Sequence, residues 1–169
     1  MTVKDKTKKK SNELNLETLL THFQKTHPTA AIQTETHQIL ITIKVEKVEF
    51  PLFIRMTEDH DLLQLLSFFP CNIKAGSEPD TARCLHLLNK ELDIPGFGMD
   101  DLNGLIFYRC MIPCPDNQFN QVVVDKFFAA VQSICKSFFP LIFAVSQGNL
   151  KFADIADKLS EMMQASGQV

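Results

Sequence analysis

The chain has 169 residues, of which 45% are hydrophobic and 22% are charged, and its formal net charge is −3. This composition excludes a disordered or fibrous protein, and the length is sufficient for one domain with a substantial core. Residues 1–10 hold five lysines and one aspartate, a charge of +4, so the other 159 residues carry −7. Such an acidic body is a poor match for a polyanion, which predicts that nucleic acid is not a partner.

The lysine-rich segment 1–11 is expected to be a disordered, solvated tail, because it has no apolar face. No apolar signal segment follows it, and the apolar run at residues 138–145 is much shorter than the ~20 residues that a spanning helix needs. We therefore expect a cytoplasmic protein without membrane insertion. Five cysteines, an odd number, predict reduced and mostly buried thiols rather than a disulfide framework.

Apolar residues at helical spacing predict a first helix over residues 16–23, with Asn12 or Asn15 as its cap. A less regular strand is expected at residues 30–35, and a hairpin follows it. Hydrophobic residues occupy odd positions from 39 to 45 and even positions from 48 to 54. A reversal centred on Glu46 and Lys47 places all eight side chains on one face.

The same hairpin register sets Lys44 opposite Glu49 on the other face, and opposite charges stabilise such a cross-strand pair. Glu-Lys is, however, not a favoured dipeptide for a tight turn.

Residues 62–70 fit either a helix or a fully covered strand, and periodicity alone leaves both open. A second helix is predicted to start at Ser77 and to stop at Pro95 and Gly96.

Residues 96–112 predict a hairpin, with a short strand at Phe97, a reversal at Asn103-Gly104 and a strand over residues 105–112. Asp116 or Asn117 is expected to open the longest helix, which Pro140 should kink or end. The predicted fold class is α+β, an antiparallel sheet packed by helices in the order α-β-β-β(-β)-α-β-β-α. One domain should cover residues 12–148, followed by an appended amphipathic helix and tail at 149–169.

Catalytic chemistry finds little support in the spacing of reactive residues. Cys84, Cys114, Asp100 and Asp101 are the candidates for an enzyme that uses a thiol or a carboxylate. His86 lies two residues from Cys84 and would point to another helix face, and the adjacent aspartates are better explained as turn residues. Since no metal-ligand or cofactor motif occurs either, we expect no catalytic, metal or cofactor residues.

Aromatic and aliphatic residues gather beyond what a core requires at Phe138, Phe139, Leu141 and Phe143. These four residues are candidates for contact with a partner protein, and simple core packing is an equal alternative. Ile106 and Tyr108, on the predicted strand 105–112, are the further candidates for partner binding.

The segment LHLLNKELDIPGFGMDDLNGLIFYRCMIP, residues 85–113, resembles the YbjN-like branch of the type III secretion chaperone-like fold. The likeness comprises a helix ending near an Asn, a G-F-x-x-D turn into a hairpin and an Arg-bearing strand closed by Pro. It continues through the following helix and covers residues 12–148. The lysine-rich tail and the terminal helix depart from it.

The resemblance implies a small, often dimeric, acidic and cytoplasmic bacterial protein that binds another polypeptide and has no catalytic residues. Secretion chaperones of this fold hold an extended segment of their cargo along apolar patches. The leading hypothesis is therefore a non-catalytic, homodimeric protein-binding module. The alternatives are a small enzyme that uses a thiol or carboxylate, and a regulatory protein without cargo export.

Overall fold

The computed structural model describes residues 13–59 and 61–155, which fold around one antiparallel sheet. Its strands lie in the order β1-β2-β3-β4-β6-β5, and every neighbouring pair is antiparallel. The elements in chain order are α2 (Leu16–Gln24), β1 (Ala31–Gln33), β2 (Gln38–Val45), β3 (Val48–Met56), β4 (Leu62–Asn72), α3 (Glu78–Glu91), β5 (Phe97–Asp100), β6 (Leu105–Pro113), the short 3-10 helix η1 (Pro115–Asn117) and α4 (Gln121–Ser146). This architecture confirms the predicted α+β fold class.

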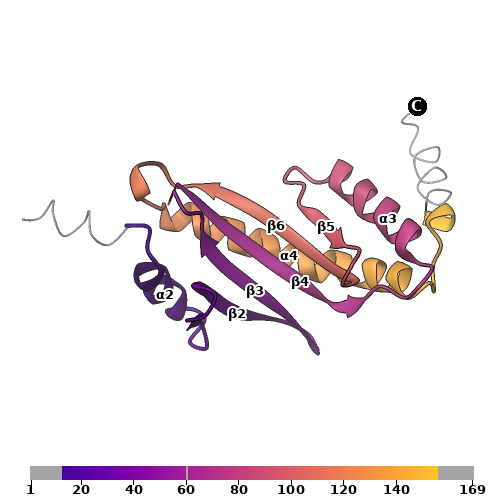
Figure 1. The fold of residues 1–169 in the computed structure, drawn as a ribbon, viewed down its shortest axis with the longest axis horizontal. Coiled ribbons are helices and arrows are strands. Elements are labelled where there is room, and N and C mark those ends of the chain that lie inside the picture. The colour runs from indigo at the N-terminus through magenta and orange to yellow at the C-terminus, as the bar shows by residue number, and fades with distance from the viewer. Residues whose placement is uncertain (1–12, 60, 156–169) are drawn as a thin grey trace, which may run out of the picture.

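The long helix α4 runs along one face of the sheet, behind β4 and β6 in Figure 1. We call this side the core face. The ring of Phe23 in α2 contacts Phe128 of α4, and Phe97 of β5 contacts Phe138 of α4, so α2 and the edge strand β5 pack against the same helix. The hydrophobic core lies between α4 and the core face.

The β2–β3 hairpin has the predicted register, with Val45 opposite Val48 and Ile39 opposite Ile54. The predicted inward positions are buried or half-buried, and Lys44 Nζ lies 2.9 Å from a Glu49 carboxylate oxygen. Glu46 takes a left-handed conformation, with φ of 54°. The pairing of apolar side chains therefore set the register, although Glu is a poor residue for such a turn.

The ambiguous segment 62–70 forms the central strand β4, which pairs with β3 on one side and β6 on the other. Leu63, Leu65 and Phe69 are buried on the core face, whereas the intervening Leu66 and Phe68 are only half-buried. Because apolar residues occupy both faces, the two-residue period is hidden in the sequence.

The side chain of Asn89, near the end of α3, organises the approach to β5. Its Oδ1 accepts hydrogen bonds from the backbone N–H groups of Gly96 and Phe97, and its Nδ2 donates to the carbonyl of Phe97. The Tyr108 hydroxyl donates to the carbonyl of Ile94 at 2.8 Å. These side-chain bonds satisfy backbone groups of residues 94, 96 and 97 and join the predicted helix to the predicted hairpin.

The start predicted for the longest helix was wrong by four or five residues. Asp116 and Asn117 lie in η1 and have φ values of 58° and 55°. An α-helix cannot include residues with such positive φ values. The helix begins instead at Gln121, where the Asn120 side chain accepts hydrogen bonds from the N–H groups of Val122 and Val123.

Pro140 lies inside α4 and does not end it, since the helix continues to Ser146. The residue four positions earlier, Lys136, is exposed, as is Pro140 itself. The Lys136 carbonyl, which loses its helical donor, can therefore bond to water. By length and composition α4 alone among the described helices could cross a membrane, a property that core helices share.

Residues 152–155 are helical and pack on α3, and the rest of the predicted terminal helix lies outside the described residues. The Arg83 guanidinium lies 4.2 Å from the centre of the Phe152 ring, and Lys151 Nζ lies 3.5 Å from an Asp80 carboxylate oxygen. The predicted tail at residues 1–11 likewise falls outside the described part.

Candidate interaction surface

The four catalytic candidates do not converge. Cys84 is buried in α3 and Cys114 is buried after β6, whereas Asp100 and Asp101 lie at the β5–β6 turn. Burial raises the pKa of the Cys84 thiol to about 11 and also raises that of Cys114. Both thiols are therefore protonated at neutral pH, where a catalytic cysteine needs its thiolate.

Asp100 serves the turn, as its place in the sequence predicted. Its carboxylate accepts hydrogen bonds from the Asn103 side chain at 2.7 Å and from the N–H groups of Leu102 and Asn103. The Asn103 side chain is the main cause of the lowered pKa of Asp100. No cluster of three or more His, Cys, Asp or Glu side chains suited to a metal occurs within residues 13–59 and 61–155.

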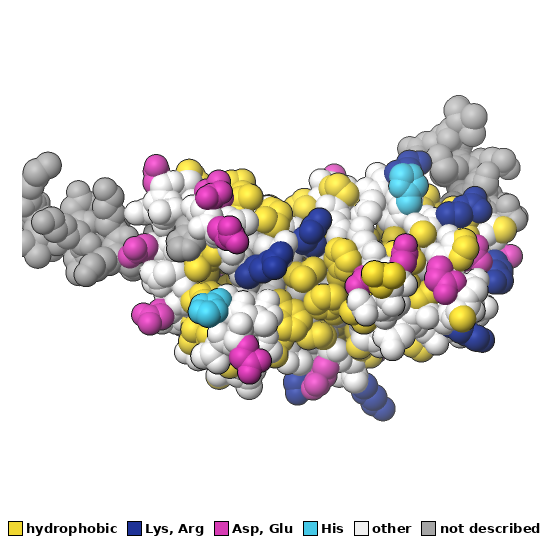
Figure 2. Space-filling view, viewed as in Figure 1, with side chains coloured by type: hydrophobic (Ala, Val, Ile, Leu, Met, Phe, Trp, Pro, Cys, Tyr) yellow, Lys and Arg dark blue, Asp and Glu magenta, His cyan; other side chains and the backbone are white. Residues whose placement is uncertain are grey.

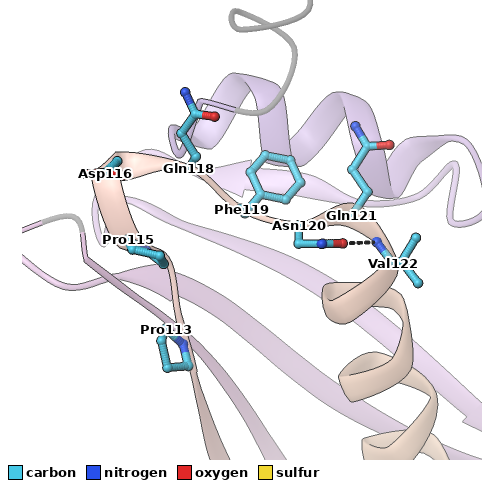
Figure 3. Close-up of a pocket in the computed structure, with 8 residues that line it drawn as sticks. All are labelled: Pro113, Pro115, Asp116, Gln118, Phe119, Asn120, Gln121 and Val122. Atoms are coloured by element: carbon cyan, nitrogen blue, oxygen red, sulfur yellow. Dashed lines mark hydrogen bonds between the residues drawn. The ribbon is translucent and has the colours of Figure 1, made fainter.

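A pocket of about 840 Å³ lies between the end of β6 and the start of α4 (Figure 3). Figure 3 shows the Asn120 amide turned to the backbone of Val122, where it caps the helix. Asp116 is the one titratable side chain among the residues that line this pocket. This composition supplies neither a nucleophile with a base nor a set of metal ligands.

The predicted partner-binding residues divide into two groups. Ile106 and Tyr108 are fully buried on the core face of β6, so they offer no surface to a partner in this structure. Phe138, Phe139 and Leu141 are half-buried against the core, and Phe143 is 42% exposed. Of these candidates on α4, Phe143 alone presents its side chain substantially to solvent.

A larger apolar surface lies on the sheet side opposite α4, which we call the open face. No helix of the described part packs on it, and Figure 2 shows hydrophobic side chains across its middle. Every apolar side chain there is partly exposed. The apolar residues of the open face include Leu40, Pro51, Phe53, Leu62, Leu66, Phe68, Leu105, Phe107 and Met111.

Aromatic rings form the centre of the open face. The rings of Phe53 and Phe68 meet edge to face at 5.8 Å between centroids, and those of Phe68 and Phe107 at 6.2 Å. The Phe107 ring also lies over Gly98, where a Cβ atom would come within 2.6 Å of it. The rings are thereby held in place, which gives the open face a rigid apolar centre.

Two arginines interrupt the apolar surface, and Figure 2 shows dark blue side chains in its middle. Arg55 donates through Nε to Gln64 Oε1 at 2.5 Å, and Arg109 is exposed beside Leu66. Among the described residues neither arginine pairs with a carboxylate. The open face therefore combines apolar area with unneutralised positive charge in an otherwise acidic protein.

The sequence reasoning missed this surface although a signal was present. Residues 105–112 are apolar on both faces, which predicts a strand that is central or covered twice, and residues 62–70 fit either a helix or a fully covered strand. The strands are indeed central, yet helices cover only one face. A strand with apolar residues on both faces is either buried on both sides or leaves one apolar face exposed as a binding surface.

Comparison with known proteins identifies one family. The model of the YbjN family, described as "Putative bacterial sensory transduction regulator", matches residues 12–144. This range contains the whole sheet and nearly all of α4. No curated protein matches the chain.

Proposed function

Because the chain belongs to the YbjN family, whose description is regulatory, we propose that it is a non-catalytic regulator that binds another polypeptide on its open face. The observation that carries this proposal is the rigid apolar centre formed by Phe53, Phe68 and Phe107, which no described helix covers. Contiguous exposed apolar area on a soluble protein is typical of a protein-binding surface.

The electrostatics favour a partner segment with acidic residues. Arg55 and Arg109 lie among apolar side chains and pair with no described carboxylate, so a carboxylate from a partner could pair with either. Charges placed around an apolar centre give specificity and guide the approach of a partner. Apolar contact would then provide most of the affinity.

The remaining expectations are parts of the same proposal. We infer a cytoplasmic protein that forms a homodimer and acts without inserting α4 into a membrane. A role as a secretion chaperone, suggested by the fold resemblance, differs from regulation only in what happens to the partner. The protonated, dispersed thiols and the turn-bound Asp100 lend no support to the enzyme alternative.

Co-purification with a matched pair of variants tests the proposal. The untagged protein is purified from its native host as wild type, as Leu66→Glu on the open face, and as Leu102→Glu. Leu102 is 96% exposed in the β5–β6 turn, so the same chemical change there leaves the open face intact. We expect a companion protein with wild type and Leu102→Glu and none with Leu66→Glu.

Two results would argue against the proposed function. One is a wild-type protein that elutes without any companion. The other is a companion that remains bound to Leu66→Glu, since a buried glutamate on the binding face should remove it. Peptide identification then names the companion, and thermal unfolding verifies that all three proteins are folded.

A further inference from the structure

The free edge of β6 gives the open face a second means of binding a polypeptide. Strand β6 pairs with β4 along its whole length, but β5 pairs only with residues 105–108. The last bond on that side joins the N–H of Arg109 to the carbonyl of Gly96 at 2.9 Å. Residues 110–113 continue β6 beyond any described strand on this side.

The direction of the backbone groups follows from the alternation of an antiparallel ladder. Arg109 directs its N–H toward β5, and Cys114 directs its own toward Asp61, before β4. Odd-numbered residues of β6 thus present their backbone groups to the β5 side. The N–H and C=O of Met111 therefore point outward, where they are available to an added strand.

The chain itself stops β5 from continuing along this edge. In the β5–β6 register the residue opposite Met111 is Ile94, and the N–H of Gly96, which faces Arg109, is taken by the Asn89 side chain instead. The segment before β5 is held away from Met111 by the bond from the Tyr108 hydroxyl to the Ile94 carbonyl. The edge is consequently free because of local structure, and closing it would require breaking this network.

A groove of about 500 Å³ follows the free edge, and the outline of the molecule is hollowed there in Figure 2. Ile94, Pro95 and Phe107 supply apolar walls, and Arg109 and Met111 line the strand side. Ile94 and Met111 are 37% and 36% exposed, two of the few large hydrophobic residues so exposed in the described part. An extended backbone on the edge would place alternate side chains against these residues.

Arg109 supplies the charge that selects the occupant. It is the one charged residue between positions 109 and 113, and it points to the open face, where no described carboxylate pairs with it. A second β6 edge would bring another arginine into this region, whereas an acidic segment would neutralise the first. The charge therefore favours an acidic polypeptide over a second copy of the same edge.

We propose that the free edge of β6 at residues 109–113 accepts an extended acidic segment of the partner as an added strand. Backbone bonds to Met111 hold the segment, Ile94 and Phe107 contact its apolar side chains, and Arg109 pairs with its carboxylate. This inference rests on the proposed function and specifies how the partner binds.

Fluorescence anisotropy with two labelled peptides tests the added strand. The probes are TVTVEVTVT and its lysine counterpart TVTVKVTVT, titrated with the full chain to about 1 mM at low salt. Wild type should bind the glutamate probe saturably and prefer it. Arg109→Glu should reverse the preference, changing each affinity by roughly two- to fivefold, the effect of an exposed charge pair.

A pair of variants at one position tests the backbone bond. Met111→Pro removes the outward N–H and leaves the β4 side of the ladder intact, so glutamate-probe binding should weaken roughly three- to tenfold. Met111→Ala keeps that N–H and should bind more tightly than Met111→Pro. Thermal unfolding verifies folding, and the Arg109→Glu charge exchange decides the question if Met111→Pro does not fold.

The inference is overturned by absent probe binding to wild type, by an unchanged preference in Arg109→Glu, or by equal binding of the two Met111 variants. Its failure is separable from that of the proposed function. A companion protein lost with Leu66→Glu but retained with Met111→Pro and Arg109→Glu would leave the proposed function standing without the added strand. Loss of the companion with all three variants would support both.

Discussion

Gly96 has no room for a side chain. A Cβ atom at this position would lie 2.2 Å from the Arg109 carbonyl oxygen and 2.9 Å from the Tyr108 ring. The first neighbour is backbone, held by the bond from the Arg109 N–H to the Gly96 carbonyl, so it cannot turn aside as a flexible side chain would. Glycine is needed here because the two strands pack closely.

Gly96→Ala should therefore lower the free energy of unfolding by about 1–3 kcal/mol, the range for inserting a group into packed structure. Urea denaturation measures the loss. Leu102→Ala, at a nearly fully exposed position, is the control and should change stability by less than about 0.5 kcal/mol. A Gly96→Ala protein as stable as wild type would show that the two strands can separate without cost.

The five cysteines behave as buried hydrophobic residues. All are free and buried, and burial raises the pKa of Cys84 and Cys135 to about 11 and that of Cys110 to about 12. In the unfolded chain these thiols lose their protons near their ordinary pKa of 9.0. Their contribution to stability is thus fully present below pH 9 and declines as the pH rises toward 11–12.

The native protein should consequently react slowly with a thiol reagent at pH 8, and all five thiols should react at once after denaturation. The urea midpoint should fall between pH 9 and 11. Cys110→Ala should have a lower midpoint at pH 8 but a shallower decline, because one titrating thiol is gone. Rapid labelling of Cys84 in the folded protein would revive the hypothesis of a thiol enzyme.

At the scale of elements, helix α4 contains Pro140 in its interior and still continues past it. The helix continues for six residues after Pro140, and Ile142 and Val145 beyond it are buried in the core. Tertiary packing of the segment after Pro140 thus outweighs the lost backbone bond to Lys136. Of the two predicted effects of Pro140, the end of the helix is wrong, because a prediction from propensity alone could not include that packing.

Pro140→Ala should stabilise the protein by about 1–3 kcal/mol, since it restores an N–H donor at an exposed position of the helix. The increase is measured as a higher urea midpoint. Ser137→Ala, also exposed on α4, is the matched control and should add about 0.5 kcal/mol or less. A destabilised Pro140→Ala protein would indicate that the proline ring itself contributes essential contacts.

At the scale of the whole molecule, the two faces of the sheet have different tasks. Phe50 and Phe53 lie in the same strand, three residues apart, but Phe50 is fully buried against Phe69 and Phe139 whereas Phe53 is half-exposed on the open face. The core face stabilises the fold. The open face, under the proposed function, is retained for a partner.

Phe50→Ala should cost about 3–5 kcal/mol of unfolding free energy, as expected for a large buried aromatic, and Phe53→Ala less than half as much. Urea denaturation of both variants measures this difference. Binding of an apolar dye should fall in folded Phe53→Ala because the open face loses its aromatic centre. Equal losses of stability in both variants would mean that the open face is as essential to the fold as the core.

Local patterns were sufficient for much of this protein. The parity of apolar residues determined the β2–β3 register to the residue, and the turn residues predicted the β5–β6 hairpin, because both depend on neighbours close in the chain. The apolar spacing likewise predicted α2, and of the two predicted caps, Asn12 and Asn15, Asn15 is the cap in the structure. The family resemblance, based on residues 85–113, was confirmed by a match over residues 12–144.

Tertiary structure decided what those patterns left open. The apolar runs in β4 and β6 are compatible with one or two covering layers, and only the position of α4 shows that one face stays open. Ile106 and Tyr108 were predicted to contact a partner, but they are buried on the core face. Arg109 could be recognised as part of a free strand edge only because β5 pairs no further than Tyr108. A side chain's accessibility depends on segments distant in sequence, and no local period encodes it.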